Sequence, residues 1–153
     1  AEGTFDALTG LYSRAKWEKD KEELFNAGGA IVFIDLDDFK EVNDNFGHVI
    51  GDETLRIIGK RLNNCVKQNM DKVYRYGGDE FIVYLKRCED CALVIERLKK
   101  AIENPITLDG LPIRVTMSYG VVKLHDFQNI DEAFRSVDFM MYESKKKKRN
   151  ENL

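Results

Sequence analysis

Residues 74–85, YRYGGDEFIVYL, place two adjacent glycines between two runs of aromatic and β-branched residues. Such runs favour strands, and a Gly-Gly pair permits the positive φ angles of a tight turn. We therefore expect strands over residues 72–76 and 80–86, paired antiparallel as a hairpin. Asp79 and Glu80 follow the glycines and would lie at its tip. Further strands from the rest of the chain are expected to pair with this hairpin in one sheet.

A third strand is predicted at residues 30–35, AIVFID, an apolar run typical of a buried central strand that ends in Asp35. Five helices are predicted. The first two are residues 13–26, with Ser13 as N-cap, and residues 38–45. A longer helix follows with Leu55, Ile58, Leu62 and Cys65 on its buried face, then a helix that ends at Asn104-Pro105, and a last helix from about Asp131 that packs Phe134, Val137, Met140 and Met141 inward. Residues 106–115 predict a small hairpin around Asp109-Gly110, and residues 113–124 a long strand.

Without the first helix and the small hairpin, the order of elements is βαββαβ. This order predicts an α+β fold with a ferredoxin-like, polymerase-palm-like antiparallel central sheet flanked by helices. Two different functions share this topology, namely RNA recognition on the sheet face and two-metal nucleotidyl transfer. At 153 residues and 43% hydrophobic content, we expect one domain over residues 1–153, with residues 1–5 as a linker or a cloning remnant.

The charge balance argues against nucleic acid as a partner. The chain has 24 basic and 27 acidic residues, a formal net charge of −3. Asp79 and Glu80 would also repel a phosphate chain that crossed the hairpin, which disfavours the RNA-binding alternative. No apolar run approaches membrane length, so we expect no membrane contact from this segment.

The three cysteines are too few and of the wrong parity for a disulfide framework, which indicates a reducing compartment. Cys88 and Cys91 form a lone CxxC. A zinc site would need two more ligands, and His48 and His125 are distant in sequence without ligand-like spacing. We interpret the pair as structural or incidental.

The predicted topology brings Asp35, Asp79 and Glu80 to one end of the sheet. Carboxylates gathered in this way repel one another unless a cation lies among them. Oxygen ligands favour Mg²⁺ or Mn²⁺, and two such ions can bind a triphosphate and polarise an attacking hydroxyl. The sequence therefore favours metal-assisted phosphate chemistry at this end.

Residues 77–81, Gly-Gly-Asp-Glu-Phe, are the GGDEF signature, and the chain resembles the catalytic domain of GGDEF diguanylate cyclases from about Asp6 to Asn150. The other matching segments are DALTGLYSR at 6–14, FIDLDDFKEVNDNFGHVIGDE at 33–53, VTMSYGV at 115–121 and VDFMMYESKKKKRN at 137–150. The resemblance implies that two GTP are condensed into cyclic di-GMP and two pyrophosphates. Each 3′-hydroxyl would attack the α-phosphate of the nucleotide held by the partner subunit of a head-to-head dimer.

The same resemblance implies a bacterial protein that acts in the cytoplasm. It further implies a longer protein with an N-terminal sensory or dimerisation region, which could anchor the whole to a membrane. Isolated, the domain would be largely monomeric.

By resemblance, two Mg²⁺ or Mn²⁺ ions per active site would be held by Asp35, Asp79, Glu80 and the Leu36 carbonyl. Asp79, Glu80 and Asp35 are thus the expected catalytic residues. The expected substrate-binding residues are Phe39, Lys40, Asn43, His48, Asp52, Gly77, Gly78, Lys145 and Arg149.

Several of these residues also have a plain structural interpretation. The Asp52 carboxylate can accept from guanine N1–H and the N2 amine, which favours GTP over ATP, but it could equally stabilise a helix N-terminus. Asn43 could be a local cap. Lys145 and Arg149 share a helix face and match the triphosphate-binding pair of the family, while Lys146, Lys147 and Lys148 are interpreted as solvated. The family usually has glycine at the position of Lys148.

Many members of the family carry an Arg-x-x-Asp product-binding site, where this chain has Gln68-Asn69-Met70-Asp71. Glutamine lacks the bidentate guanidinium fork, so primary product inhibition is predicted to be absent or much weakened. The alternative function is a GTP-binding regulatory module that does not cyclise.

Overall fold

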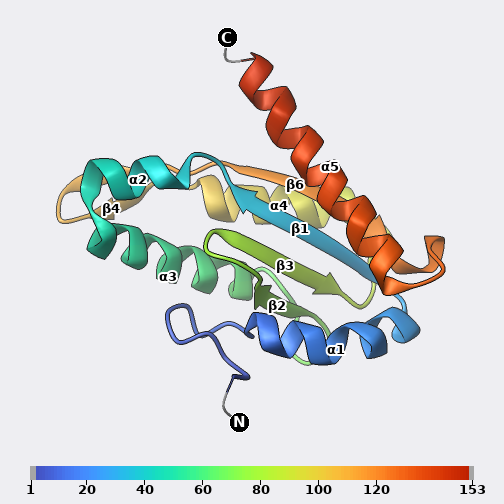
Figure 1. Ribbon diagram of the computed structural model, residues 1–153. Coiled ribbons are helices and arrows are strands. Elements are labelled where there is room, and N and C mark those ends of the chain that lie inside the picture. Colours follow the sequence, from blue (N-terminus) through green and yellow to red (C-terminus); the bar gives the residue numbers. More distant parts are fainter. Residues whose placement is uncertain (1–2, 152–153) are drawn as a thin grey trace.

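A four-stranded antiparallel sheet forms the centre of the computed structural model, which describes residues 3–151 (Figure 1). The strands are β1 Ala30–Leu36, β2 Lys72–Arg75, β3 Glu80–Leu85 and β6 Met117–Lys123, in the spatial order β2-β3-β1-β6. Every neighbouring pair is antiparallel. The predicted βαββαβ arrangement is confirmed, with the hairpin strand β3 directly beside β1.

The central strand β1 is buried along its whole length because both faces of the sheet are covered. Its alternate side chains enter two separate cores, as the pleat of a strand requires. One core contains Ala30, Val32, Ile34 and Leu36, and the other contains Ile31 and Phe33. The acidic residue that ends this apolar run is therefore held at the edge of a rigid element.

Helices cover each face. Residues of α3 His48–Asn64 and α4 Cys91–Glu103 belong to the first core, and residues of α1 Arg14–Ala27 and α5 Ile130–Glu151 to the second. The short helix α2 Phe39–Phe46 follows β1 directly, and a single 3₁₀ turn spans Leu124–Asp126. None of the helices within residues 3–151 is long and apolar enough to cross a membrane.

The helix boundaries follow local chemistry. Ser13 caps α1, its side chain accepting from the Lys16 N–H, and Gly28 ends the helix with φ 84°. The small hairpin also forms as predicted, with β4 Ile106–Leu108 and β5 Leu111–Ile113. Asp109 and Gly110 both have positive φ, the conformation that a two-residue hairpin turn requires.

Two sequence predictions are wrong in detail. The last strand begins at Met117 rather than 113, because residues 111–113 pair in the separate hairpin instead. Met140 was expected to pack inward, but it is 42% exposed. The buried stripe of α5 is narrow, running through Ala133, Val137 and Met141, and Met140 lies beside it.

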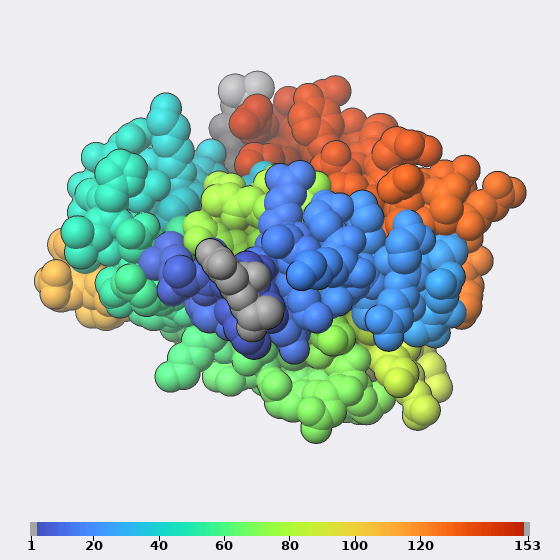
Figure 2. Space-filling view, turned by 60° about the horizontal axis from the view of Figure 1, so that its bottom comes forward, coloured from blue at the N-terminus to red at the C-terminus, as the bar shows by residue number. Residues whose placement is uncertain are grey.

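The segment before α1 lies against the β2–β3 hairpin, where Figure 2 shows it in blue beside the green residues. Tyr12 donates its N–H to Val73 and accepts from the Arg75 N–H. Phe5 forms an isolated bridge with Tyr12, so this residue of the expected linker belongs to the fold. Residues 1 and 2 lie outside the described residues.

Candidate active site

The predicted carboxylates meet at one end of the sheet. In the β1–β3 pair Asp35 lies opposite Glu80, and the N–H of Leu36 donates to the Asp79 carbonyl at 3.1 Å. The pairing register alone brings these residues together, since β1 and β3 are more than forty residues apart in sequence.

Asp35 lies in an unfavourable electrostatic environment. Its side chain is 12% exposed, and its Oδ2 accepts from Lys145 Nζ at 2.9 Å. Its Oδ1 is buried and has no hydrogen-bond partner among the described residues. Burial raises the pKa of Asp35, the hydrogen bond from Lys145 opposes this rise, and the charge of Asp79 adds to it. Burial likewise raises the pKa of Glu80, and the charges of Asp35 and Asp79 raise it further.

These features fit a divalent cation that is shared with a phosphate ligand. The buried Asp35 Oδ1 is an acceptor that requires a partner, and all nearby donors to a metal are hard oxygens. Within residues 3–151, no three His, Cys, Asp or Glu side chains are arranged as a ready-made metal cluster. Mg²⁺ commonly binds through one or two carboxylates plus substrate phosphates, so this donor set suits it.

The glycines of the turn provide space rather than the positive φ angles expected of a tight turn. Neither Gly77 nor Gly78 has a positive φ, because the N–H groups of Tyr76 and Gly77 both donate to the Glu80 carbonyl and close a wider turn. A Cβ on Gly77 would lie 2.2 Å from Glu80 Oε1, whereas one on Gly78 would meet nothing within 4 Å. Gly77 therefore makes room for the Glu80 carboxylate, and the backbone at Gly78 is open to an approaching ligand.

Arg75 holds this turn in place, a role that the sequence analysis left unresolved. Its Nη2 and Nε donate to the Gly78 carbonyl at 2.8 and 3.1 Å. Its Nη1 lies 3.2 Å from both carboxylate oxygens of Asp6. Asp6 in turn accepts from the N–H and hydroxyl of Thr9. The segment before α1 is thus connected directly to the acidic turn.

A hollow of about 300 Å³ adjoins the acidic turn. Its lining residues are Phe39, Lys40, Asn43, Asp52, Leu55, Arg75, Gly78 and Asp79. The structure therefore brings together five predicted substrate-binding residues with Asp79 and adds Leu55 and Arg75. Gly51 also affects this hollow, because it leaves room for the Asn43 side chain. A Cβ at position 51 would lie 1.8 Å from Asn43 Oδ1. Sequence spacing carried no signal for this contact.

A second, smaller hollow of about 70 Å³ lies where the end of β1 meets α5. Its lining residues are Asp37, Asp38, Thr116, Lys145, Lys148 and Arg149. Lys145 and Arg149 are thus on one hollow, as the shared helix face predicted. Asp38 has φ 53°, a strained conformation for a residue other than glycine and one that is common at functional sites.

The interpretation of Lys148 as a solvated lysine is wrong. Its Nζ donates to Asp37 Oδ2 at 2.8 Å and also to the Met117 carbonyl. Asp37 further accepts from the hydroxyls of Thr116 at 2.7 Å and Ser118 at 2.6 Å. Burial alone would raise the pKa of Asp37, but the hydrogen bonds from Lys148, Ser118 and Thr116 outweigh it and lower the pKa.

Some predicted site residues are not among those that line the hollows. His48 is exposed at the start of α3, and Leu36 is fully buried, with its backbone next to the acidic turn. Gly77 acts through the space that it leaves for Glu80.

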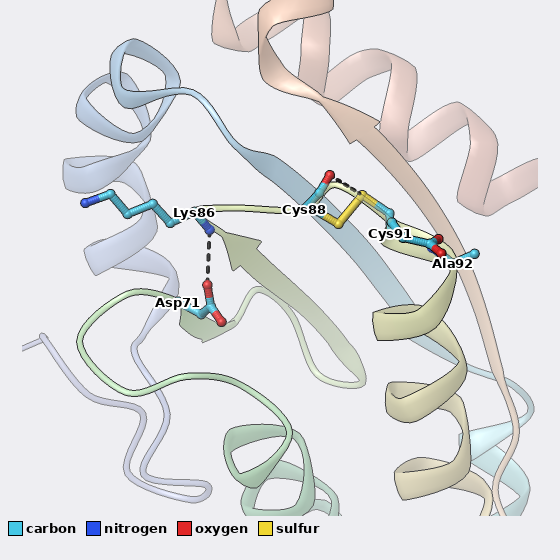
Figure 3. Close-up of a disulfide and its surroundings, with 6 residues drawn as sticks. Asp71, Lys86, Cys88, Cys91 and Ala92 are labelled. Atoms are coloured by element: carbon cyan, nitrogen blue, oxygen red, sulfur yellow. Dashed lines mark hydrogen bonds between the residues drawn. A yellow bond between two sulfur atoms is a disulfide. The ribbon is translucent and has the colours of Figure 1, made fainter.

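The CxxC pair lies at the opposite end of β3. Cys88 and Cys91 are joined by a disulfide across the turn into α4 (Figure 3). Beside it, Asp71 Oδ1 accepts from the Lys86 N–H at 3.1 Å. The lone CxxC, interpreted from the sequence as structural or incidental, therefore links two residues only three apart. Cys65 is the free cysteine among the described residues.

A βαββαβ sheet with an acidic hairpin tip beside an open hollow is the architecture of a palm-like catalytic domain. The family model described as the GGDEF domain of diguanylate cyclases matches residues 3–151. The chain belongs to this family, whose cyclases depend on metal ions.

Individual relatives agree with this membership. Diguanylate cyclase VdcA of Vibrio cholerae is 33% identical over 95% of this chain and 45% of its own length. Cyclic di-GMP phosphodiesterase NbdA of Pseudomonas aeruginosa is 32% identical over 95% of this chain and 20% of its own length. The solved GGDEF domain of TpbB (YfiN) from Pseudomonas aeruginosa has a TM-score of 0.86 at 29% identity, covering 94% of this chain and 89% of that domain. The chain therefore spans less than half of the two full-length relatives.

Proposed function

We propose that this domain is a diguanylate cyclase that condenses two GTP into cyclic di-GMP and two pyrophosphates. The observation that carries the proposal is the buried, unpartnered Oδ1 of Asp35 at the edge where Asp79 and Glu80 meet it. A cation would supply the partner that this atom lacks, and the adjoining hollow contains residues that suit a guanine nucleotide.

Asn43 and Asp52 would recognise the base. Both line the 300 Å³ hollow, and Asp52 can accept from the N1–H and N2 amine of guanine, a donor pair that adenine lacks. Phe39 and Leu55 supply apolar contact on the same hollow. This arrangement supports GTP as the substrate.

Two Mg²⁺ or Mn²⁺ ions, when bound, would neutralise the triphosphate and activate the attacking 3′-hydroxyl. The carboxylates of Asp35 and Asp79 and the carbonyl of Leu36 would hold them. Glu80, whose pKa is raised by burial and by neighbouring carboxylates, would bind metal or accept the hydroxyl proton. The open backbone at Gly78 would allow the nucleotide to approach closely.

Lys145 and Arg149 would bind the β- and γ-phosphates. Lys145 Nζ lies 2.9 Å from Asp35 Oδ2. The side chains of Lys145 and Arg149 both line the 70 Å³ hollow, next to the Leu36–Lys40 backbone. When the triphosphate enters, Lys145 can exchange its carboxylate partner for a phosphate oxygen with little movement. His48 is exposed at the start of α3 and would contact the substrate from the edge of the site.

Catalysis would require two domains facing each other, each presenting its nucleotide to the other. We propose that the isolated domain is largely monomeric and works within a longer bacterial protein that brings two copies together in the cytoplasm. Sedimentation at micromolar concentration would test the monomer, and a tight dimer would contradict it.

Primary product inhibition would be absent or weak. Gln68 is exposed and donates to the Asn63 carbonyl, and Asp71 already accepts from the N–H groups of Lys67 and Lys86. Residues 68–71 therefore lack the guanidinium fork that an Arg-x-x-Asp pair would offer to guanine. Turnover that stops at low-micromolar cyclic di-GMP, with product bound at residues 68–71, would contradict this.

The deciding experiment is chromatographic analysis of products after concentrated protein is incubated with GTP and Mg²⁺. The Asp79→Ala, Glu80→Ala double variant should form none. The Glu22→Ala, Glu23→Ala double variant loses the same charge on the exposed surface of α1 and should match the unmodified domain. Cyclic di-GMP made by the unmodified domain and by this control, but not by the turn variant, would support the proposal.

A GTP-binding module that does not cyclise is the second candidate. The match to a region of a protein named as a phosphodiesterase shows that family membership alone does not decide the activity of a whole protein. GTP binding without product, even after fusion to a dimerisation module, would favour this candidate.

A further inference from the structure

The C-terminal part of α5 extends past the hydrophobic core. The buried residues of α5 end at Met141, although the helix continues to Glu151. Figure 1 shows this red end of the helix projecting beyond the sheet. Apolar packing on the sheet therefore does not hold residues 142–151 in place, although the proposed phosphate-binding residues Lys145 and Arg149 lie there.

Two ion pairs connect this projecting segment to the end of β1. Lys145 Nζ contacts Asp35 Oδ2 at 2.9 Å, and Lys148 Nζ contacts Asp37 Oδ2 at 2.8 Å. Asp35 is in β1 and Asp37 follows the strand directly, while Lys145 and Lys148 are three residues apart in a helix and therefore lie on one face of α5. The spacing of the two lysines on α5 therefore matches the spacing of the two aspartates at the end of β1.

The pair of Lys148 with Asp37 is the better anchor. Asp37 is 11% exposed and is held by the hydroxyls of Thr116 and Ser118, while Lys148 also donates to the Met117 carbonyl. Asp35, in contrast, has an oxygen without a partner, and Lys145 would leave it for a phosphate. Once the nucleotide is bound, the Lys148–Asp37 pair would be the ion pair that still connects the projecting end of α5 to the end of β1.

We infer that Lys148 is a positioning residue for the triphosphate end of the site. By pairing with Asp37 it holds the last turns of α5 against β1, so that Lys145 and Arg149 face the 70 Å³ hollow. The inference rests on the proposed function. It also gives a reason for lysine where the family usually has glycine, since lysine continues a helix better than glycine and can reach Asp37.

The test compares four single variants. Lys148→Ala and Asp37→Asn each break the pair, and Lys148→Arg preserves it. Lys147→Ala removes the same charge from an exposed position one residue away. The measurements are the Kd for GTP with Mg²⁺, KM and kcat for product formation, and amide hydrogen exchange of residues 142–151 without nucleotide.

We expect Lys148→Ala and Asp37→Asn to raise the Kd and KM for GTP on the order of threefold to tenfold, the effect of losing one charged hydrogen bond. Exchange of residues 142–151 should quicken in both, and kcat at saturating GTP should change less than about twofold. Lys148→Arg should restore the binding, and Lys147→Ala should behave like the unmodified domain.

Two results would overturn the inference. If Lys148→Ala matches Lys147→Ala in exchange and Kd, the pair has no positioning role. If Lys148→Ala weakens GTP binding but Asp37→Asn does not, Lys148 binds phosphate directly. A domain that binds GTP without making product would refute the proposed function, while Kd and exchange would still decide the role of Lys148. Absence of GTP binding by the unmodified domain would overturn both.

Discussion

Arg75 donates two hydrogen bonds to the Gly78 carbonyl, at 2.8 and 3.1 Å, and so holds the turn from which Asp79 and Glu80 project. The same guanidinium pairs with Asp6 in the segment before α1. The Arg75 side chain therefore connects this segment to the acidic turn, in addition to the backbone hydrogen bonds of Tyr12 with Val73 and Arg75.

Replacement of Arg75 by lysine tests this connection. A lysine cannot reach Gly78 and Asp6 together, because it lacks the planar fork. We expect Arg75→Lys to lower the free energy of unfolding by about 1–3 kcal/mol and to reduce product formation further through the loosened turn. Urea denaturation and product analysis would measure the two effects. Arg114→Lys, on an exposed arginine, is the control, and equal behaviour of the two variants would rule out the connection.

The Asp6 contact should make stability depend on pH. Burial alone would raise the pKa of Asp6, but hydrogen bonds from Thr9 and the charge of Arg75 outweigh it and lower the pKa below 3.8. A carboxyl group with a lowered pKa in the folded state stabilises above its unfolded pKa, and that stability is lost as the pH falls through the folded value.

Comparison with Asp6→Asn isolates this contribution. We expect the unmodified domain to be more stable than Asp6→Asn by a constant amount above about pH 5, and the difference to shrink below about pH 4. Urea denaturation between pH 3 and 7 would measure it. A difference that stays the same across this range would contradict the charge-based explanation.

Asp35 should show opposite effects on stability and activity. Its carboxylate is buried with one oxygen unpartnered, so Asp35→Asn removes a desolvated charge and should leave the unfolding free energy unchanged or raise it by up to about 1 kcal/mol. Product formation should fall by about 100-fold or more, because a proposed metal ligand is lost. Thermal denaturation and product analysis beside Asp126→Asn, an exposed control, would check both. A strongly destabilised Asp35→Asn variant would show that the carboxylate serves the fold instead.

Gly51 should matter for nucleotide binding although it is not among the residues that line the 300 Å³ and 70 Å³ hollows. A methyl group at this position would lie 1.8 Å from Asn43 Oδ1, so Gly51→Ala should displace the Asn43 side chain. We expect weaker GTP binding by about tenfold but little loss of stability, because the Asn43 side chain can rotate away and alanine continues a helix better than glycine by about 0.5–1 kcal/mol. Calorimetric titration with GTP would measure the binding, with Lys60→Ala on the exposed face of the same helix as control. Unchanged binding by Gly51→Ala would separate Asn43 from base recognition.

The sequence by itself determined the βαββαβ order, the strand that ends in Asp35 and the hairpin tip with Asp79 and Glu80. These depend on local signals, namely apolar runs, turn residues and caps, which act over a few residues and are readable in one dimension. The shared GGDEF signature added the expected roles of the site residues, which remain proposals.

Only the tertiary structure decided the contacts between segments far apart in the chain. The β1–β3 register placed Asp35 opposite Glu80, and helix packing brought Lys148 to Asp37 and Gly51 to Asn43. A lysine run looks solvated in sequence, because the aspartate that pairs with Lys148 comes from a distant part of the chain. Such pairings depend on how whole elements pack, which no local pattern of residues records.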